Sequence, residues 1–378
     1  MGFFRIIKES DKSHARLGIL RTSHGIVETP AFVPVATQAV FKTLTSKQAR
    51  ETRSQLAIAN TFHLHLKPGE KTIKRAGGLG AFMAWPKPLM TDSGGFQIFS
   101  LGFGSDFGTG KILKGKRAEK IGIEAQPRRV EITEAGAWFR SIVDGTRLFI
   151  GPKESMKIQS DLGADIIFAF DECTSPIAGK AYTKKSLERS HRWAELSLAY
   201  HSKKQKLFGI IQGGKYKDLR KKSARFIGAL PFDGFGIGGE FGDSKKNMMG
   251  MISWVLNELP PEKPRHLLGI GHPDDIKKII RAGIDLFDCI APTHYARRGF
   301  AFTSRGRLDM RKISFLADRK PLDSRCKCDV CRNYSRAYIT HLMRSGEITG
   351  MSLLTMHNLY YFNTFVEEIR RGIRAGRI

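Results

Sequence analysis

Short apolar runs alternate with longer amphipathic segments along most of the chain. Eight of these runs are bounded by Gly, Pro, Asn or Asp, which is typical of buried strands. The runs are Ala31–Ala36, Leu56–Thr61, Leu89–Asp92, Asp165–Asp171, Leu207–Gln212, Gly234–Gly238, His266–Gly271 and Leu286–Ile290. Several of the intervening segments are long enough for helices, which we expect at Lys153–Leu162, Lys184–Ser202, Lys215–Ile227, Lys245–Asn257 and Pro273–Ala282.

This alternation of strand and helix indicates an α/β protein with a parallel sheet. Eight repeats in a chain of 378 residues fit a (β/α)8 TIM barrel. An open, doubly wound sheet is the alternative architecture. It fits less well, because no Gly-x-Gly-x-x-Gly pattern follows the first strand.

Two regions depart from the regular repeat. About seventy residues separate Asp92 from the next strand, and we interpret Phe96–Pro152 as hairpins inserted on the barrel rim. Residues 312–378 carry a cysteine cluster and two helical patterns, at Arg332–Ser345 and Met351–Ile369. We therefore expect a catalytic barrel over residues 1–311, with its insertion at about 96–152, and a zinc-binding helical subdomain over 312–378.

The net charge of the chain indicates the kind of molecule that it binds. The chain has 63 Lys and Arg against 36 Asp and Glu, a formal net charge of +27, which favours binding to a polyanion such as a nucleic acid. The 41% apolar content supplies a large core and excludes wholesale disorder. No uninterrupted apolar run approaches the ~18 residues of a spanning helix, and no signal-peptide core precedes the first charges. We expect a cytoplasmic protein with no membrane partner.

Three thiols, Cys326, Cys328 and Cys331, fall within six positions. This spacing favours a tetrahedral zinc site that needs one more ligand, for which His341 and His357 are the candidates. A helix after Cys331 would carry His341 about 15 Å away, whereas a second helix running back antiparallel would return His357. The prediction is a closed Cys3His site holding structural Zn²⁺.

Polar residues end several of the predicted strands. Asp92, Asp171, Gln212, the pair Gly238-Gly239 and Asp288 all fall at carboxyl ends, where (β/α)8 enzymes place their working groups. Each aspartate alone has an ordinary alternative as a cap for the next helix. Together, paired carboxylates around a cleft are suited to acid–base and nucleophilic catalysis at a glycosidic bond. The positive net charge indicates that this bond belongs to a nucleic acid.

Several motifs resemble those of the tRNA-guanine transglycosylases, of the bacterial single-chain type. They are Thr91-Asp92-Ser93-Gly94-Gly95-Phe96-Gln97, Phe170-Asp171-Glu172-Cys173-Thr174, Ile211-Gln212-Gly213, Phe287-Asp288-Cys289 with Pro292-Thr293, and the Cys326/Cys328/Cys331/His357 spacing. The resemblance covers nearly the whole chain. It implies a zinc-bearing pentosyltransferase of queuosine biosynthesis that exchanges the wobble guanine of tRNA for a 7-deazaguanine. Its partners would be tRNA and a free guanine-like base, and the family commonly forms homodimers.

The resemblance also implies roles for individual residues. Asp288 would be the nucleophile that attacks ribose C1′, and Asp92 the general acid and base. The edge of the base would be read by Asp171, Gln212, Ser93 and the backbone N–H of Gly239, and its faces would be sandwiched by Phe96 and Leu268. Arg297 and Arg298 follow the nucleophile strand and are candidates for tRNA contacts.

The resemblance leaves open which base the enzyme inserts into tRNA. Bacterial members that take the aminomethyl base preQ1 generally read Gly-Gly-Leu-Ala-Val-Gly where this chain reads Gly238-Gly239-Glu240-Phe241-Gly242-Asp243. The glycine at 242 removes bulk beside the substituent, and the carboxylate of Glu240 either pairs with the amine of the base or faces solvent as a loop charge. Cys173 favours the alternative, preQ1, because it keeps the bacterial form of the neighbouring motif. Our hypothesis is an enlarged pocket that accepts queuine directly.

Two other functions compete with this reading. A non-catalytic tRNA-binding subunit of a heterodimeric transglycosylase would have lost the nucleophile or the acid, yet Asp92 and Asp288 are both present. A zinc nucleobase deaminase is disfavoured because its His-x-Glu signature is missing and the expected Cys3His site leaves no position for water.

Overall fold

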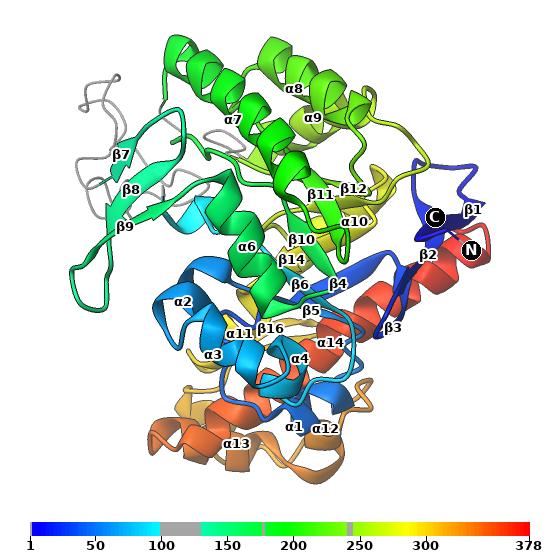
Figure 1. The fold of residues 1–378 in the computed structure, drawn as a ribbon. Coiled ribbons are helices and arrows are strands. Elements are labelled where there is room, and N and C mark those ends of the chain that lie inside the picture. The colour runs from blue at the N-terminus through cyan, green and yellow to red at the C-terminus, as the bar shows by residue number, and fades with distance from the viewer. Residues whose placement is uncertain (1, 99–129, 176–177, 240–244) are drawn as a thin grey trace.

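The computed structural model describes residues 2–98, 130–175, 178–239 and 245–378. Eight parallel strands form its central sheet, in the order β4-β14-β13-β12-β11-β10-β6-β5 (Figure 1). The strands are β4 (Ala31–Pro34), β5 (Ala57–Ala59), β6 (Leu89–Thr91), β10 (Ile166–Phe168), β11 (Lys206–Ile211), β12 (Gly234–Ile237), β13 (Arg265–Leu267) and β14 (Leu286–Cys289). All eight predicted strands are confirmed.

The sheet closes on itself between its first and last strands. A parallel bridge joins Val35 to Ile58, and the backbone N–H of Ala36 donates to the carbonyl of Ile58 at 2.7 Å. The β4 strand thus contacts β14 on one side and β5 on the other. This closure confirms the (β/α)8 barrel and excludes the open, doubly wound sheet.

Helices cover the outside of the barrel. The five predicted ones are confirmed as α6 (Pro152–Leu162), α7 (Lys180–Tyr200), α8 (Lys217–Ala229), α9 (Lys245–Leu256) and α10 (Pro273–Arg281). Shorter helices follow the other strands, namely α1 (Ser46–Glu51), α2 (Thr61–Leu66), α3 (Glu70–Arg75), α4 (Leu79–Phe82) and α11 (Ala291–Ala296). Over the part of the chain that is described, no helix combines the length and apolar character needed to cross a membrane.

The described part of the insertion is an antiparallel sheet of β7 (Val130–Ile132), β8 (Ala137–Arg140) and β9 (Arg147–Ile150). The ring of Phe139 packs on Phe62 of α2, with 5.2 Å between centroids. Trp193 of α7 donates its indole N–H to the carbonyl of Glu134 at 2.7 Å. These contacts fix the hairpins to the barrel rim, and residues 99–129 of the predicted insertion lie outside the described residues.

Two small sheets were not anticipated from the sequence. The first, β1 (Phe4–Glu9), β2 (Arg16–Thr22) and β3 (Gly25–Thr29), contributes Leu20 and Val27 to a buried cluster with the inward side chains of the barrel strands. It therefore covers one end of the barrel interior. The second is the hairpin of β15 (Phe300–Thr303) and β16 (Gly306–Asp309), which follows α11.

The C-terminal helical patterns are present with shifted bounds. The predicted helix at 332–345 is divided into α12 (Asp329–Asn333) and α13 (Arg336–Arg344). The division falls at Ser335, whose hydroxyl accepts from the backbone N–H of Tyr338 and so caps a new helix. The second helix, α14, runs over Ile348–Arg374 and is longer than predicted at both ends.

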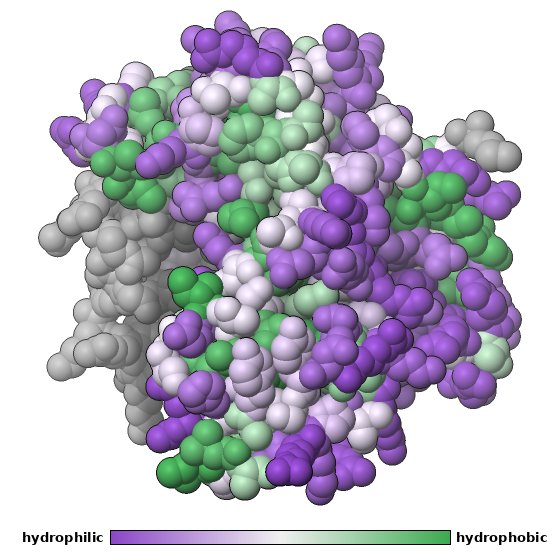
Figure 2. Space-filling view, turned by 90° about the horizontal axis from the view of Figure 1, so that it is seen from below, coloured by the Kyte–Doolittle hydropathy of each residue, from purple (hydrophilic) through white to green (hydrophobic). Residues whose placement is uncertain are grey.

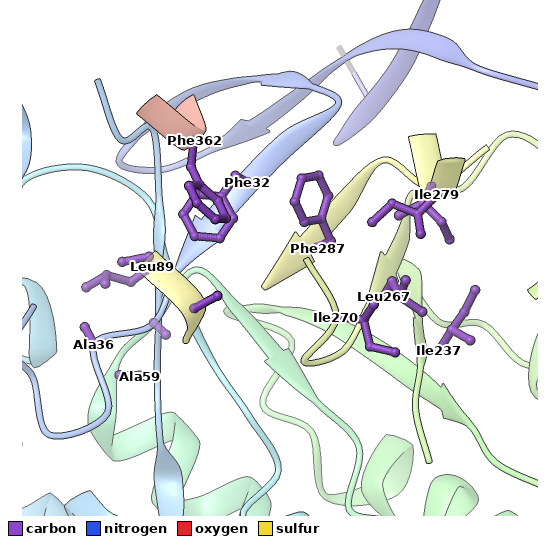
Figure 3. Close-up of a cluster of buried hydrophobic side chains, with 14 of the residues drawn as sticks. Phe32, Ala36, Ala59, Leu89, Ile237, Leu267, Ile270, Ile279, Phe287 and Phe362 are labelled. Atoms are coloured by element: carbon purple, nitrogen blue, oxygen red, sulfur yellow. The ribbon is translucent and has the colours of Figure 1, made fainter. Parts of the chain in front are cut away.

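Aromatic side chains join α14 to the barrel. Phe362 of α14 packs on Phe32 of β4 with 5.2 Å between ring centroids, and Phe32 lies 5.9 Å from Phe287 of β14 (Figure 3). All three rings are buried. This packing holds α14, which carries His357, against the strand that carries Asp288.

Candidate active site

A cavity of about 510 Å³ opens at the carboxyl ends of the barrel strands. This is the end at which (β/α)8 enzymes carry their chemistry, and the volume suits a small-molecule ligand. Its lining includes eight of the predicted site residues, which are Asp92, Ser93, Phe96, Asp171, Gln212, Gly239, Leu268 and Asp288. Residues from the five predicted strand ends are thus brought together in one place with Leu268, which follows β13.

Asp92 follows β6 and is held by the start of α2. Its Oδ1 accepts from the backbone N–H of Thr61 at 2.9 Å and from that of Gly94 at 3.2 Å, while the amide of Asn60 donates to Oδ2. Burial and, to a smaller extent, the negative charge of Asp288 raise the pKa of Asp92 to about 7, against the lowering effect of the two backbone donors. Near neutral pH this carboxyl can both give and take a proton.

Asp288 lies on β14, and two donors meet one of its oxygens. The backbone N–H of Gly269 and Nε2 of His266 each lie 2.9 Å from Oδ1. His266 is fully buried, and its ring stands edge-on to Phe168 at 5.5 Å. The carboxylate is therefore held in one orientation at the cavity wall.

A polar wall faces the cavity near Asp171. The hydroxyl of Ser93 donates to Oδ1 of Asp171 at 2.9 Å, and Nε2 of Gln212 donates to Oδ2. This bond fixes the amide of Gln212, so that its Oε1 is a buried acceptor with no hydrogen-bond partner among the described residues. A buried acceptor left unpaired is costly, which favours a ligand that supplies an N–H group here.

Backbone conformation beside Gln212 requires a glycine. Gly239 has φ of +80°, and a Cβ at this position would come within 2.3 Å of Oε1 of Gln212. Any side chain would therefore displace the amide from the cavity wall. The neighbouring Glu240 and Gly242 lie outside the described residues, so the predicted pocket enlargement has no structural description.

Arg297 and Arg298 lie beyond the cavity, at the end of α11. Both are exposed, and Nε of Arg297 donates to the carbonyl of Thr293 at 3.1 Å. The burial of His294 and the positive charges of Arg298 and Arg297 lower the pKa of this histidine. Two exposed positive charges thus lie at the end of the helix that follows β14, the strand of Asp288.

The cysteine cluster meets the predicted histidine. One ligand atom from each of Cys326, Cys328, Cys331 and His357 lies within 4.8 Å of all the others. Nε2 of His357 lies 2.8 Å from the carbonyl oxygen of Phe302, which can only accept, so Nδ1 presents its lone pair to the thiols. Four such ligands could bind a metal ion, and His341 is not among them.

Several supporting residues were missed by the sequence analysis. They are Asn60 and Thr61 at Asp92, and His266 and Gly269 at Asp288. A signal for His266 was available, since it lies two residues before Leu268 and period-two alternation places both side chains on the same face of a strand. Asn60 also caps α2, because its side chain accepts from the backbone N–H of His63.

The barrel and its cavity define a class of protein. A carboxyl with a pKa near 7, a second carboxylate held by two donors and an unpaired buried acceptor meet in one cavity, at the end of the barrel where enzymes of this fold carry their chemistry. The protein is a (β/α)8-barrel enzyme.

Comparison with known proteins identifies the family. The family model described as queuine tRNA-ribosyltransferase matches residues 11–378. Proteins named queuine tRNA-ribosyltransferase from Thermoanaerobacter pseudethanolicus and Desulforamulus reducens are each 44% identical, over 99% of this chain and 94% and 95% of their own lengths. An Archaeoglobus fulgidus protein that carries the same name provisionally is 45% identical, over 99% of this chain and 96% of its own length. The chain belongs to the queuine tRNA-ribosyltransferase family.

Proposed function

We propose that this enzyme exchanges the guanine at the wobble position of tRNA for a 7-deazaguanine. The observation that carries the proposal is that one cavity joins Asp92 and Asp288, two carboxyls in different environments, to the polar wall of Asp171 and Gln212. Retention of both carboxyls in the cavity argues against a non-catalytic subunit.

Asp288 is the proposed nucleophile. One of its carboxylate oxygens forms a bond to ribose C1′ while the bond between C1′ and N9 of guanine breaks and its electron pair passes to the base. Asp92, protonated in part near neutral pH, supplies the proton that the departing guanine takes up. The product of this half-reaction is a ribosyl ester of Asp288 and a free guanine.

The second half-reaction reverses these movements with the incoming base. The carboxylate of Asp92 removes the proton from the ring nitrogen of the new base, this nitrogen forms the bond to C1′, and the ester bond to Asp288 breaks. Two inversions at C1′ give retention of configuration and ping-pong kinetics. One glycosidic bond replaces another, so no nucleotide cofactor is required.

The polar wall is the proposed reader of the base edge. A guanine-like ring offers adjacent N–H donors that match the carboxylate of Asp171 and the unpaired Oε1 of Gln212. Ser93 and the backbone N–H of Gly239 would bind the same edge, and Phe96 and Leu268 would enclose the faces. An anticodon loop is already single-stranded, so turning its base into the cavity costs little.

The Cys3His group is proposed to hold zinc. Three thiolates and one imidazole nitrogen match the ligand preference of structural Zn²⁺ and leave no coordination position for a catalytic water. When bound, the ion links the segment of Cys326–Cys331 to α14. We retain the division into a barrel over 1–311 and a zinc-binding subdomain over 312–378 as part of this proposal.

Two further parts of the proposal concern tRNA contacts and cellular location. Arg297 and Arg298 would contact tRNA, and the enzyme would act in the cytoplasm.

A homodimer is also proposed. It is supported by exposed apolar side chains on α13 and α14, which contact each other: Tyr338 is 44% exposed and Ile348 is 71% exposed. The face of the molecule seen from below, where Figure 1 places α12 and α13, carries separate hydrophobic areas among hydrophilic ones (Figure 2). Sedimentation of wild type and Tyr338→Arg tests this assembly.

Queuine remains the proposed incoming base, on the sequence argument at Glu240 and Gly242. Competition among guanine, preQ1 and queuine tests it. Efficient use of preQ1 with no use of queuine would contradict an enlarged pocket. Selective loss of queuine by Gly242→Val would support it.

Exchange of labelled guanine into tRNA tests the proposed function directly. Wild type should incorporate label and form a protein–RNA adduct that survives denaturation. Asp288→Ala should do neither, while its tRNA affinity and thermal midpoint stay near the wild-type values. Exchange by Asp288→Ala at the wild-type rate would overturn the mechanism, and no exchange by wild type with any tRNA carrying a wobble guanine would overturn the function.

A further inference from the structure

Arg307 lies on an aromatic platform close to the active site. Its guanidinium carbon stands 4.6 Å from the ring centroid of Phe300 and 5.0 Å from that of Tyr295. Tyr295 belongs to α11, which begins three residues after Asp288, and Phe300 begins β15. Pairing of Phe302 with Arg307 in the β15–β16 hairpin puts Arg307 on the same side as these rings.

The platform is anchored in the core. The ring of Tyr295 packs edge-on against Phe302 at 5.3 Å, and Phe302 packs against Phe362 of α14 at 5.3 Å. The backbone of Phe302 donates to Asn358 and accepts from His357, both on α14. These contacts leave the rings under Arg307 little freedom to move.

Two arginines on this platform differ in their charge environment. Arg311 also stacks on Phe300, at 4.8 Å, but its guanidinium donates to both carboxylate oxygens of Asp309, at 2.8 and 2.9 Å. Arg307 is exposed and makes no ion pair with any described residue. Its positive charge is therefore held in place by rings and is not neutralised by the protein.

We propose that Arg307 binds a backbone phosphate of tRNA close to the wobble nucleotide. The inference rests on the proposed function, because tRNA is the polyanion that reaches this end of the barrel. A stacked guanidinium keeps its N–H donors at the edge of the plane, where they can bind phosphate oxygens. The six residues of α11 span roughly 9 Å, so the platform lies within a few nucleotides of the ribose that Asp288 attacks.

The test compares Arg307→Gln with Arg311→Gln in the full-length, zinc-loaded protein. Affinity for an unmodified tRNA with a wobble guanosine is measured over a range of salt concentrations. We expect Arg307→Gln to weaken binding several-fold and to reduce the slope of log affinity against log salt by about 0.7–0.9, the value for one phosphate contact. Arg311→Gln should keep the wild-type slope because Asp309 already neutralises its charge.

Two further measurements separate the possible failures. The thermal midpoint and the KM for guanine should stay unchanged in Arg307→Gln, which would exclude a general loss of structure. Wild-type affinity and slope in Arg307→Gln, or an equal loss in Arg311→Gln, would overturn the inference. These outcomes differ from a failure of the proposed function, because in that case the wild-type enzyme itself would exchange no guanine.

Discussion

His266 and Asp288 form a buried pair at the cavity wall, with 2.9 Å between Nε2 and Oδ1. The imidazole is fully buried, and the same carboxylate oxygen accepts from the backbone N–H of Gly269. One side of the carboxylate is thus fixed by two donors from the β13 end. His266 is therefore a positioning residue for the proposed nucleophile.

Replacing His266 by phenylalanine should slow the chemical step. The ring still fills its buried space, but the donor to Asp288 is lost, and a hydrogen bond to a charged group contributes ~1.5–3 kcal/mol. We expect formation of the protein–RNA adduct in a single turnover to slow by about tenfold or more, with little change in the KM for tRNA. His266→Gln retains an N–H donor and should recover part of the rate, whereas a purely structural role would give no such recovery.

The pKa of Asp92 makes stability depend on pH. This pKa is about 7 in the folded enzyme against 3.8 for an ordinary aspartate, so between these values the folded state holds a proton that the unfolded chain has lost. The unfolding free energy contributed by Asp92 is therefore greatest at low pH and falls as pH rises through this window. The unfolding free energy of wild type minus that of Asp92→Asn should decrease from pH 4 to pH 7.

Chemical denaturation at several pH values measures this difference. Asp288→Asn provides the control, because removal of its negative charge should lower the pKa of Asp92 and narrow the window. A wild-type minus Asp92→Asn difference that stays constant with pH would show that the pKa of Asp92 is ordinary, and one that grows with pH would show that this pKa is lowered. Either result would contradict the raised pKa.

The barrel could be predicted because each of its strands is marked locally. Buried runs such as Asp165–Asp171 end in a polar or glycine residue, and those ends coincide with the cavity. The β1–β3 sheet could not be recognised in this way, since β1 is largely exposed and has no continuous apolar run. Pairings between distant segments, such as Arg307 with Tyr295, depend on a strand register that the sequence does not specify.

The ion pair of Arg16 and Asp285, at the end of the barrel opposite the cavity, is another contact that the sequence does not specify. They are 269 positions apart, yet Nε and a terminal nitrogen of Arg16 donate to the two oxygens of Asp285 at 2.9 and 2.6 Å, and both side chains are buried. Arg16→Met leaves the carboxylate without its charged partner, and we expect a loss of ~3–5 kcal/mol in unfolding free energy. Urea denaturation checks this value.

The partly exposed pair of Lys206 and Asp233 is the matched control. Lys206→Met should change the unfolding free energy by no more than ~1 kcal/mol, as is usual for exposed ion pairs. Equal effects of the two substitutions would show that burial does not determine the contribution of the Arg16 pair.

Loss of the proposed zinc should weaken tRNA binding, because the zinc site supports β15 and β15 supports Arg307. His357 joins the cysteines to the carbonyl of Phe302, and the ring of Phe302 supports Tyr295 beneath Arg307. Cys328→Ser should therefore lower the bound zinc, the thermal midpoint and the tRNA affinity together. We expect the midpoint to fall by roughly 3–6 °C, because an unfolding entropy of ~2.1 cal/mol/K per residue gives about 1.3 °C per kcal/mol in a chain of 378 residues, and structural zinc contributes several kcal/mol.

His341→Gln is the control for this substitution, because His341 is exposed and outside the ligand group. It should retain zinc, stability and tRNA affinity. In Cys328→Ser the rate of adduct formation at saturating tRNA should stay near the wild-type value, since the ligand group includes neither Asp92 nor Asp288. A variant that kept its stability while this rate collapsed would show that the metal acts in the chemistry, contrary to the closed ligand set.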